Sequence, residues 1–319
     1  MVVSTATTDV RSAAVHSGDR IGPGPAGLDG PTVLAVDIGG TKMVAGVVDA
    51  TGRILSEARA ATPPSDDGEI VFAALAAVID QARSSTVVTP AICGVGCGGP
   101  MGAGGKTVTP LNIRGWREFP LRSRLAEVAG MPVVVDNDAK ALALGEGWLG
   151  AAQGESNYLA MVVSTGVGGG IVLDGRLLDG AHFNAGHIGH VVVEPDGRPC
   201  VCGGRGCLEA ETSGPSITAA TGQPASEAPD TVRRRTGTMV GRAVASVANL
   251  LDLELAVVAG SVALGFGAVF FEAAQEEIEL RCRLEFSRST RIVPAGLGAD
   301  GPLIGAAAVG RRAVLASGS

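Results

Sequence analysis

Two glycine-rich segments, each set between two apolar stretches, constrain the fold of this chain more than any other feature. The first is Asp37-Ile38-Gly39-Gly40-Thr41-Lys42, and the second is Ser164-Thr165-Gly166-Val167-Gly168-Gly169-Gly170. Short apolar runs that meet at glycines are typical of buried strands joined by a tight turn. Because this strand–turn–strand unit occurs twice, and strands alternate with helices after each copy, the sequence predicts two related α/β lobes.

Both segments carry residue types that suit a bound phosphate. In the first, Asp37 ends a predicted strand, two glycines allow the backbone to approach an anion, and Thr41 adds a hydroxyl. A carboxylate at that position can also support Mg²⁺. An ordinary hairpin turn is the alternative for one segment alone, whereas the pair, one in each lobe, predicts a clamp for a nucleoside triphosphate. A strand follows each turn, which excludes a P-loop or a dinucleotide fingerprint.

The remaining chain follows the same α/β pattern. Hydrophobic residues make up 46% and charged residues 18% of the 319 residues, which is enough for a sizeable core. Apolar runs predict strands, and apolar residues at helical spacing predict helices. The predicted strands are 32–36, 43–48, 91–95, 131–135, 159–164, 170–173, 256–259 and 291–294, and the predicted helices are 69–82, 138–149, 233–251, 262–280 and 303–315.

Charge and hydropathy argue against two classes of partner. The formal net charge is −7, whereas proteins that grip nucleic acid or anionic membranes carry basic surfaces. The one stretch that could suggest a membrane span, 255–271, is uncharged but shorter than a span and contains four glycine or serine residues. Residues 1–31 lack the apolar run of a signal peptide and contain Gly-Pro pairs. We therefore expect a cytoplasmic protein with a disordered leader at 1–31.

A third segment, Val135-Asp136-Asn137-Asp138-Ala139-Lys140, joins a buried strand directly to a helix. Asp138 can cap that helix, which is the commonest role of Asp at such a place. In an enzyme of phosphoryl transfer, a carboxylate at a strand–helix junction can instead orient an acceptor hydroxyl and take its proton. Asn137 beside it can donate to or accept from neighbouring sugar hydroxyls.

Three of the six cysteines crowd into eight residues downstream of a histidine. His190, Cys200, Cys202 and Cys207 form a complete Cys₃His set for structural Zn²⁺, and glycines between the cysteines let the chain wrap an ion. Disulfides are the alternative, but Cys200 and Cys202 are poorly placed to pair, and a third thiol would be left over. His187 and His190 lie between the second glycine segment and these cysteines, so both are candidates for ligand contact.

Taken together, these motifs resemble the ROK family, which comprises repressors, open reading frames and sugar kinases. The resemblance spans roughly residues 33–308. It rests on the following segments: Asp37–Lys42, Asn137–Ala139, Thr165–Gly170, Ala185-Gly186-His187-Ile188-Gly189-His190, Cys200-x-Cys202-x4-Cys207-Leu208-Glu209, and Gly301–Ala307.

This resemblance implies an actin-like, ribonuclease-H-like fold with sugar and ATP in the cleft between two lobes. We expect a smaller N-terminal lobe at 32–140 plus 303–319, and a larger lobe with the zinc-binding loop at 141–302. The implied activity is transfer of the γ-phosphate of ATP to the 6-hydroxyl of a hexose, with Mg²⁺ and structural Zn²⁺. The family also implies a homodimer or homotetramer.

The resemblance also implies a role for each matching residue. Asp138 is the base for the 6-hydroxyl, and Asp37 supports Mg²⁺ through water. The implied sugar contacts are Gly98, Gly99, Asn137, Asp138, His187, His190 and Glu209, His190 also being a zinc ligand with Cys200, Cys202 and Cys207. The implied ATP contacts are Asp37, Gly39, Gly40, Thr41, Lys42, Thr165, Gly166 and Gly260.

One departure leaves the sugar open. Glucokinases of this family normally carry Glu where His187 stands, and exchanging a carboxylate for an imidazole changes the available hydrogen bonds. The Gly-His-Ile-Gly-His segment resembles bacterial N-acetylmannosamine kinases, so glucose and an amino or N-acetyl hexose both remain candidates. Two other activities are alternatives. A sugar-responsive regulator would need a helix-turn-helix module before the first glycine segment, where we expect only the leader. A polyphosphate-dependent glucokinase would need a basic channel, but the chain has only three lysines.

Overall fold

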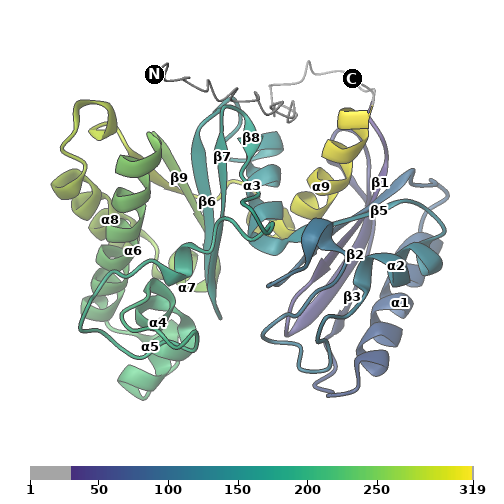
Figure 1. The fold of residues 1–319 in the computed structure, drawn as a ribbon, viewed down its shortest axis with the longest axis horizontal. Coiled ribbons are helices and arrows are strands. Elements are labelled where there is room, and N and C mark those ends of the chain that lie inside the picture. The colour runs from purple at the N-terminus through teal and green to yellow at the C-terminus, as the bar shows by residue number, and fades with distance from the viewer. Residues whose placement is uncertain (1–29, 318–319) are drawn as a thin grey trace, which may run out of the picture.

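A computed structural model describes residues 30–317, so the predicted leader at 1–31 falls outside the described residues except for Gly30 and Pro31. Two five-stranded sheets lie side by side, with helices on the outer face of each (Figure 1). The first sheet has the order β3 (Ile54–Ala61), β2 (Lys42–Val48), β1 (Val33–Ile38), β4 (Ile92–Cys97) and β5 (Val133–Asn137). The second has the order β10 (Arg291–Pro294), β9 (Leu255–Ala259), β6 (Tyr158–Val163), β7 (Val167–Leu173) and β8 (Arg176–Leu177).

The two sheets share one topology. In the first, β1 pairs antiparallel with β2, β2 pairs antiparallel with β3, and β4 is parallel to both β1 and β5. In the second, β6, β7 and β8 form the corresponding antiparallel meander, and β9 is parallel to both β6 and β10. Each glycine segment therefore joins the first two strands of its own sheet. This confirms the prediction of two related α/β lobes.

Helices lie on the outer face of each sheet and in the space between the sheets. They are α1 (Gly68–Ser84), α2 (Leu121–Ala129), α3 (Asp138–Leu149), α4 (Leu208–Thr212), α5 (Gly214–Thr221), α6 (Asp230–Leu251), α7 (Ser261–Phe266), α8 (Ala268–Arg281) and α9 (Gly301–Ser317). Local signals set the ends of several. The side chain of Asp67 caps α1 by accepting the Glu69 N–H at 2.8 Å, and Asn137 caps α3 by accepting the Ala139 N–H at 3.0 Å.

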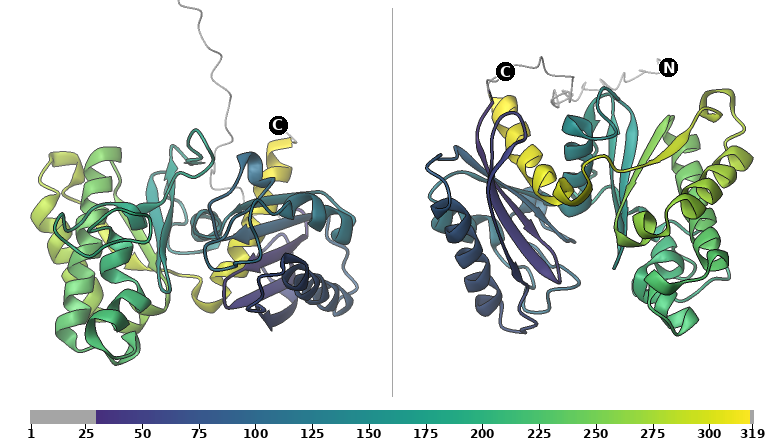
Figure 2. Two further views of the ribbon diagram at one scale, coloured as in Figure 1. Left: turned by 60° about the horizontal axis from the view of Figure 1, so that its bottom comes forward. Right: turned by 180° about the vertical axis from the view of Figure 1, so that it is seen from behind.

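Helices α3 and α9 occupy the space between the two sheets, as the front and back views both show (Figures 1 and 2). Helix α9 packs on β1 and β4 of the first sheet, whereas α3 packs on β6 and β7 of the second. The two helices cross in backbone contact. A Cβ at Gly305 would lie 2.7 Å from the Ala141 carbonyl oxygen, and one at Gly145 would lie 3.0 Å from the Gly305 Cα. Glycine is required here because a larger residue would separate the helices, and with them the sheets.

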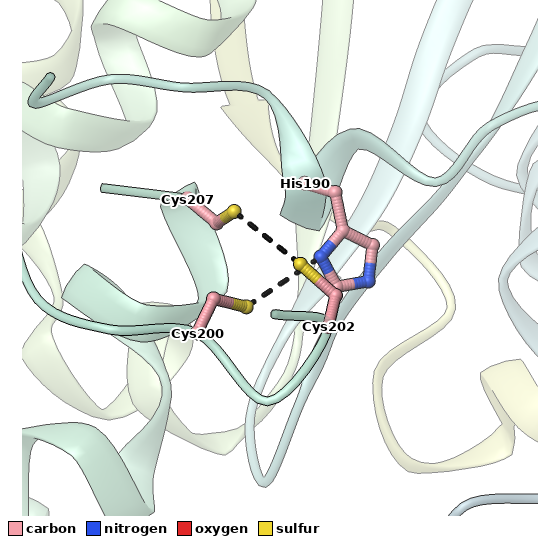
Figure 3. A group of neighbouring side chains, drawn as sticks. All are labelled: His190, Cys200, Cys202 and Cys207. Atoms are coloured by element: carbon pink, nitrogen blue, oxygen red, sulfur yellow. Dashed lines mark hydrogen bonds between the residues drawn. The ribbon is translucent and has the colours of Figure 1, made fainter. Parts of the chain in front are cut away.

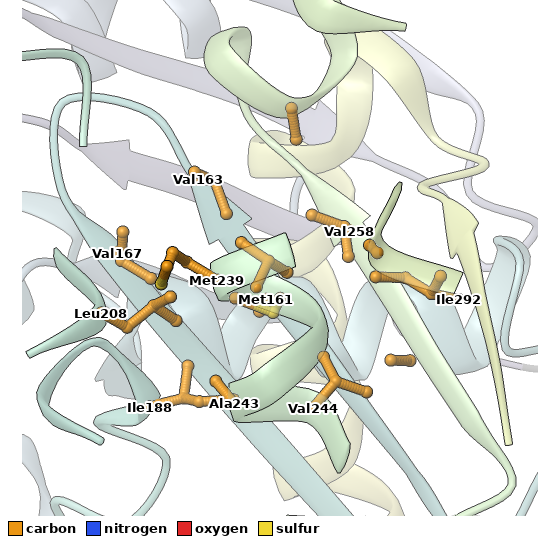
Figure 4. Close-up of a cluster of buried hydrophobic side chains, with 14 of the residues drawn as sticks. Met161, Val163, Val167, Ile188, Leu208, Met239, Ala243, Val244, Val258 and Ile292 are labelled. Carbon is orange, nitrogen blue, oxygen red and sulfur yellow. The ribbon is translucent and has the colours of Figure 1, made fainter. Parts of the chain in front are cut away.

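The core of the second sheet also anchors loops that reach the space between the sheets. Met161 and Val163 of β6 pack with Met239 of α6 in one buried cluster (Figure 4). Ile188 and Leu208 belong to the same cluster and are 3% and 0% exposed. Each lies one or two residues from a predicted site residue, so core packing fixes where those loops stand.

Most predicted elements are confirmed within two or three residues, with specific exceptions. Gly168 and Gly169 lie inside β7 rather than in a turn, so the strand predicted at 170–173 begins earlier and the second turn is shorter, at Ser164–Gly166. The single helix predicted at 262–280 is two helices, which are interrupted at Gly267, whose φ is 59°. The stretch 255–271 spans β9, α7 and the start of α8. Among the described residues, no helix is long and apolar enough to cross a membrane. Composition and spacing did not predict β3, β8, α2, α4 or α5.

Candidate active site

A cavity of about 770 Å³ lies between the two sheets and collects nearly all of the predicted site residues. Both glycine turns, the β5–α3 junction and the loop before α4 contribute to its wall. The predicted residues that line it are Asp37, Gly39, Gly40, Thr41, Lys42, Gly98, Gly99, Asn137, Asp138, Thr165, Gly166, His187, His190 and Glu209. Gly260 is the exception among the predicted sugar and ATP contacts. It precedes α7 and packs against the backbone of Val163, outside the lining of this cavity.

Two carboxylates stand close together at the strand ends of the first sheet. A Cβ at Gly96 of β4 would lie 3.6 Å from Oδ1 of Asp37 and 3.7 Å from the Cα of Asp138. Burial raises the pKa of Asp37 to about 7, and repulsion from Asp138 adds to the rise while Lys42 opposes it. Asp138 is open to the cavity, yet the cavity walls surround it, and this burial raises the pKa of its carboxyl above the ordinary value. The Ala139 N–H, which donates to Asp138 at 2.8 Å, opposes that rise.

Backbone and amide groups of the loop after β4 and of Asn137 also lie near Asp138. A Cβ at Gly98 would lie 3.9 Å from Oδ2 of Asp138, and one at Gly99 would lie 3.3 Å from Nδ2 of Asn137. Asn137 uses its side-chain oxygen to cap α3, which leaves its amide N–H groups directed toward this part of the cavity. The loop after β4 and the β5–α3 junction together form a polar corner of the cavity, and Asp138 is the ionisable residue that these two segments contribute to its lining.

Glu209, His187 and His190 come from the second lobe. Glu209 on α4 accepts the Val167 N–H at 2.8 Å, which ties α4 to the second glycine turn. The rings of His187 and His190 lie 6.1 Å apart between centroids and are inclined by 26°. Burial lowers the pKa of His187, and the neighbouring His190 lowers it further. A neutral imidazole offers one donor and one acceptor, so this wall has both kinds of hydrogen-bonding group.

His190, Cys200, Cys202 and Cys207, here called the cysteine–histidine cluster, converge behind that wall (Figure 3). Their four ligand atoms all lie within 4.8 Å of one another. Nδ1 of His190 is 3.7 Å from Sγ of Cys200, and the Sγ atoms of Cys202 and Cys207 are 3.8 Å apart. A tetrahedral zinc site with Zn–S bonds of about 2.3 Å has ligand separations of about 3.5 to 3.8 Å. The donor set and its spacing therefore fit Zn²⁺, and none of the six cysteines forms a disulfide.

The structure adds cavity residues that sequence reasoning missed. Pro110, Leu111 and Asn112 line the cavity from the loop before α2, and a Cβ at Gly40 would collide with Asn112. Asn184 lines it from the segment before His187. Prolines near Asn112 signal a loop, but no local pattern shows that this loop folds over the first glycine turn.

Comparison with known proteins agrees with this architecture. A model described as the ROK family matches residues 33–313. The N-acetylmannosamine kinase of Yersinia pseudotuberculosis is 35% identical over 249 residues, which cover 73% of this chain and 84% of that relative. Among solved structures, a ROK hexokinase from Thermus thermophilus is 35% identical with a TM-score of 0.76, over 89% of this chain and 99% of that one. A ROK family glucokinase from Streptomyces griseus, in complex with glucose and AMPPNP, is 32% identical with a TM-score of 0.77, over 88% and 99%.

The chain belongs to the ROK family. The likeness to these kinase structures confirms the predicted actin-like fold, and the predicted class of enzyme, a sugar kinase, is confirmed as well.

Proposed function

We propose that this protein transfers the γ-phosphate of ATP to the 6-hydroxyl of a hexose. The observation that carries this proposal is the position of Asp138. Its carboxylate is an ionisable group at the β5–α3 junction, in a cavity that both glycine turns line. The predicted site residues also support a single reaction centre. They extend over 172 positions of the sequence, from Asp37 to Glu209, yet they line one cavity.

In this mechanism Asp138 orients the 6-hydroxyl and accepts its proton. The hydroxyl oxygen attacks the γ-phosphorus, an O–P bond forms, the bond from the γ-phosphorus to the β,γ-bridging oxygen breaks, and ADP leaves. The raised pKa of Asp138 makes it a stronger base than an ordinary carboxylate, which favours proton removal. Backbone N–H groups of the turns at Gly39–Thr41 and Thr165–Gly166 stabilise negative charge on the transferred group.

Two metals belong to this proposal. Mg²⁺, when bound, neutralises charge on the polyphosphate, and Asp37 at the end of β1 is the residue that would hold it through water. The cysteine–histidine cluster fits a structural Zn²⁺, which would brace the loop between His190 and Glu209. In both cases the chain supplies ligands that are already on the cavity wall or directly behind it.

The sugar is proposed as glucose or an amino or N-acetyl hexose such as N-acetylmannosamine. Gly98, Gly99 and Asn137 would contact the ring near the reacting hydroxyl. His187, His190 and Glu209 would contact hydroxyls nearer the reducing end. The relatives include both an N-acetylmannosamine kinase and a glucokinase, so His187 is the position on which we expect the choice to depend.

A coupled assay with ATP tests the proposal across glucose, mannose, glucosamine, N-acetylglucosamine and N-acetylmannosamine. At least one hexose should be phosphorylated, and Asp138→Asn should lower kcat by about 10²- to 10⁴-fold while sugar binding persists. Asp174→Asn is the matched control, because Asp174 lies exposed in the β7–β8 turn at a positive φ that Asn tolerates. Near-normal turnover in Asp138→Asn would contradict the assignment of the base.

Two further parts of the proposal concern assembly and organisation. The chain is proposed to divide into lobes at 32–140 plus 303–319 and at 141–302, and to form a homodimer or homotetramer. Light scattering on the purified protein measures the oligomeric state.

Nothing in the described residues favours a sugar-responsive regulator or a polyphosphate-dependent glucokinase over an ATP-dependent hexose kinase.

A further inference from the structure

A buried lysine stands two residues after the proposed base and is not part of the mechanism above. The side chain of Lys140 on α3 is 1% exposed. Its Nζ lies 2.9 Å from Oδ1 of Asp136 and 2.6 Å from Oδ1 of Asp179. A buried ammonium is costly unless it is paired, and here two carboxylates pair with it.

The two partners of Lys140 come from different sheets' connections, one at the β5–α3 junction and one after β8. Asp136 is the last residue but one of β5, and its Oδ1 also accepts the Asn137 N–H at 2.8 Å, so it belongs to the junction that carries Asn137 and Asp138. Asp179 follows β8 in the second sheet and begins a segment that ends at His187. Lys140 thus connects the base side of the cavity to the segment 179–187, here called the histidine segment.

Other contacts fix the middle and the far end of the histidine segment. The Asn184 side chain accepts the Met101 N–H and donates to the Met101 carbonyl, both at 3.2 Å. The Ala185 N–H donates to the Asp179 carbonyl at 3.0 Å, which closes the segment into a loop. Gly186 packs on the backbone of Gly169 so closely that any side chain there would collide. At the near end of this loop, Asp179 pairs with Lys140 at 2.6 Å, and its Oδ2 also lies 3.9 Å from Nη2 of Arg312 on α9.

Resting on the proposed function, we propose that Lys140 and Asp179 are positioning residues for the sugar: their ion pair holds the histidine segment, and with it His187 and Asn184, at a fixed distance from Asp138. Neither residue lines the cavity, so both act through the segment and not by touching the hexose. Loss of the pair should weaken hexose binding and leave ATP binding at the two glycine turns unchanged.

Asp179→Asn is the informative variant. It removes the charge from the histidine segment but leaves Lys140 paired with Asp136, so no buried ammonium is stranded. Its matched control is Glu155→Gln. Glu155 pairs with Arg291 at 2.7 Å and is 32% exposed, which is close to the 2.6 Å and 38% of Asp179, but it does not line the cavity. Glu155→Gln controls for the loss of one paired carboxylate charge. Because Arg291 is 53% exposed whereas Lys140 is 1% exposed, and Asp179 also lies 3.9 Å from Arg312, Asp179→Asn should cost more stability than this control.

The first readout is steady-state kinetics of the full chain with its best hexose. Asp179→Asn should raise the KM for the hexose at least about fivefold, with the KM for ATP within about twofold of wild type. Glu155→Gln should change neither constant. Asp179→Glu, which retains the charge, should recover part of the affinity for the hexose. Unchanged hexose KM in Asp179→Asn, or an equal change in the control, would overturn the inference.

The second readout does not depend on turnover. Amide hydrogen exchange in peptides that cover the histidine segment should be faster in Asp179→Asn than in wild type, whereas β6 and β7 should keep their protection. If wild type phosphorylates no hexose, the proposed function fails, and hydrogen exchange together with equilibrium binding of glucose and N-acetylmannosamine still decides the inference. Unchanged exchange in the histidine segment would show that the ion pair does not hold it.

Discussion

Glu146 offers a quantitative test of how the two lobes are joined. It lies on α3 and is 0% exposed. Its Oε2 accepts the Ala151 N–H at 2.7 Å and the Gly296 N–H at 3.0 Å, and its Oε1 accepts the Leu297 N–H at 3.2 Å. Gly296 and Leu297 belong to the connection between β10 and α9, so one carboxylate fixes the entry to α9 on α3. The test pair of substitutions is Glu146→Gln and Glu146→Leu.

The expected losses follow from the three hydrogen bonds. A buried donor that loses its partner costs about 1 to 3 kcal/mol. Ala151 and Leu297 are half-buried and Gly296 is exposed, so water can reach part of this site, and the lower end of that range applies. Glu146→Leu, which removes all three acceptors, should therefore cost about 3 kcal/mol of unfolding free energy. Glu146→Gln keeps one side-chain oxygen, which can still accept the Ala151 and Gly296 N–H groups, and loses the acceptor for the Leu297 N–H. It should cost about 1 to 2 kcal/mol of unfolding free energy.

Urea unfolding followed by circular dichroism measures both variants against a matched surface pair. Glu276 on α8 is 65% exposed and pairs with Arg234 at 2.8 Å. Glu276→Gln and Glu276→Leu should each cost less than about 1 kcal/mol, because an exposed ion pair contributes little. A loss below about 1 kcal/mol in Glu146→Leu, or a larger loss in Glu146→Gln than in Glu146→Leu, would refute the reasoning.

Three further predictions concern the site. The pKa of Asp37 is 3.8 in the unfolded chain and about 7 in the folded protein, so the folded protein favours the protonated carboxyl. As pH rises from about 4 to 7, Asp37 therefore destabilises the folded protein increasingly. The melting temperature of Asp37→Asn relative to wild type should accordingly increase between pH 5 and pH 8, and a pH-independent difference would contradict this. Elemental analysis should find about one zinc per chain, and chelation should lower the melting temperature by about 5 °C or more, since losing a structural site removes folding free energy. Metal-free protein of equal stability would count against the zinc site. His187→Glu should raise kcat/KM for glucose relative to N-acetylmannosamine by about tenfold in the coupled assay, because a carboxylate accepts hydrogen bonds only; an unchanged ratio would remove His187 from the choice of sugar.

Groups of candidate site residues that lie close together in the chain could be predicted from the amino-acid sequence. The two glycine turns, the Asn137-Asp138 junction and the cysteine–histidine cluster each consist of residues a few positions apart, and their residue types by themselves indicate phosphate, a hydroxyl group or a metal ion. The helix at 138–149 was predicted with both ends correct, but its N-cap residue is Asn137, whereas the sequence had suggested Asp138. The duplicated strand–turn–strand pattern likewise predicted two related lobes.

The long-range contacts required the tertiary structure. Lys140 and Asp179 pair across 39 positions, Asn184 and Met101 across 83, and Glu146 and Leu297 across 151. Asn112 covers Gly40 although no periodicity relates the two residues. The second glycine run illustrates the same limit, because pairing with β6 places Gly168 and Gly169 in β7 despite their weak strand propensity.

The sequence by itself determined which chemical groups the protein has and the short elements that carry them, because capping, turn geometry and metal-ligand spacing act over a few residues. Only the tertiary structure decided which of those groups meet in one cavity, and which ion pairs and backbone hydrogen bonds hold its walls. The physical reason is that such pairings depend on how the two sheets pack across α3 and α9, where an ordinary lysine, asparagine or glutamate becomes important through the partner that the fold brings to it.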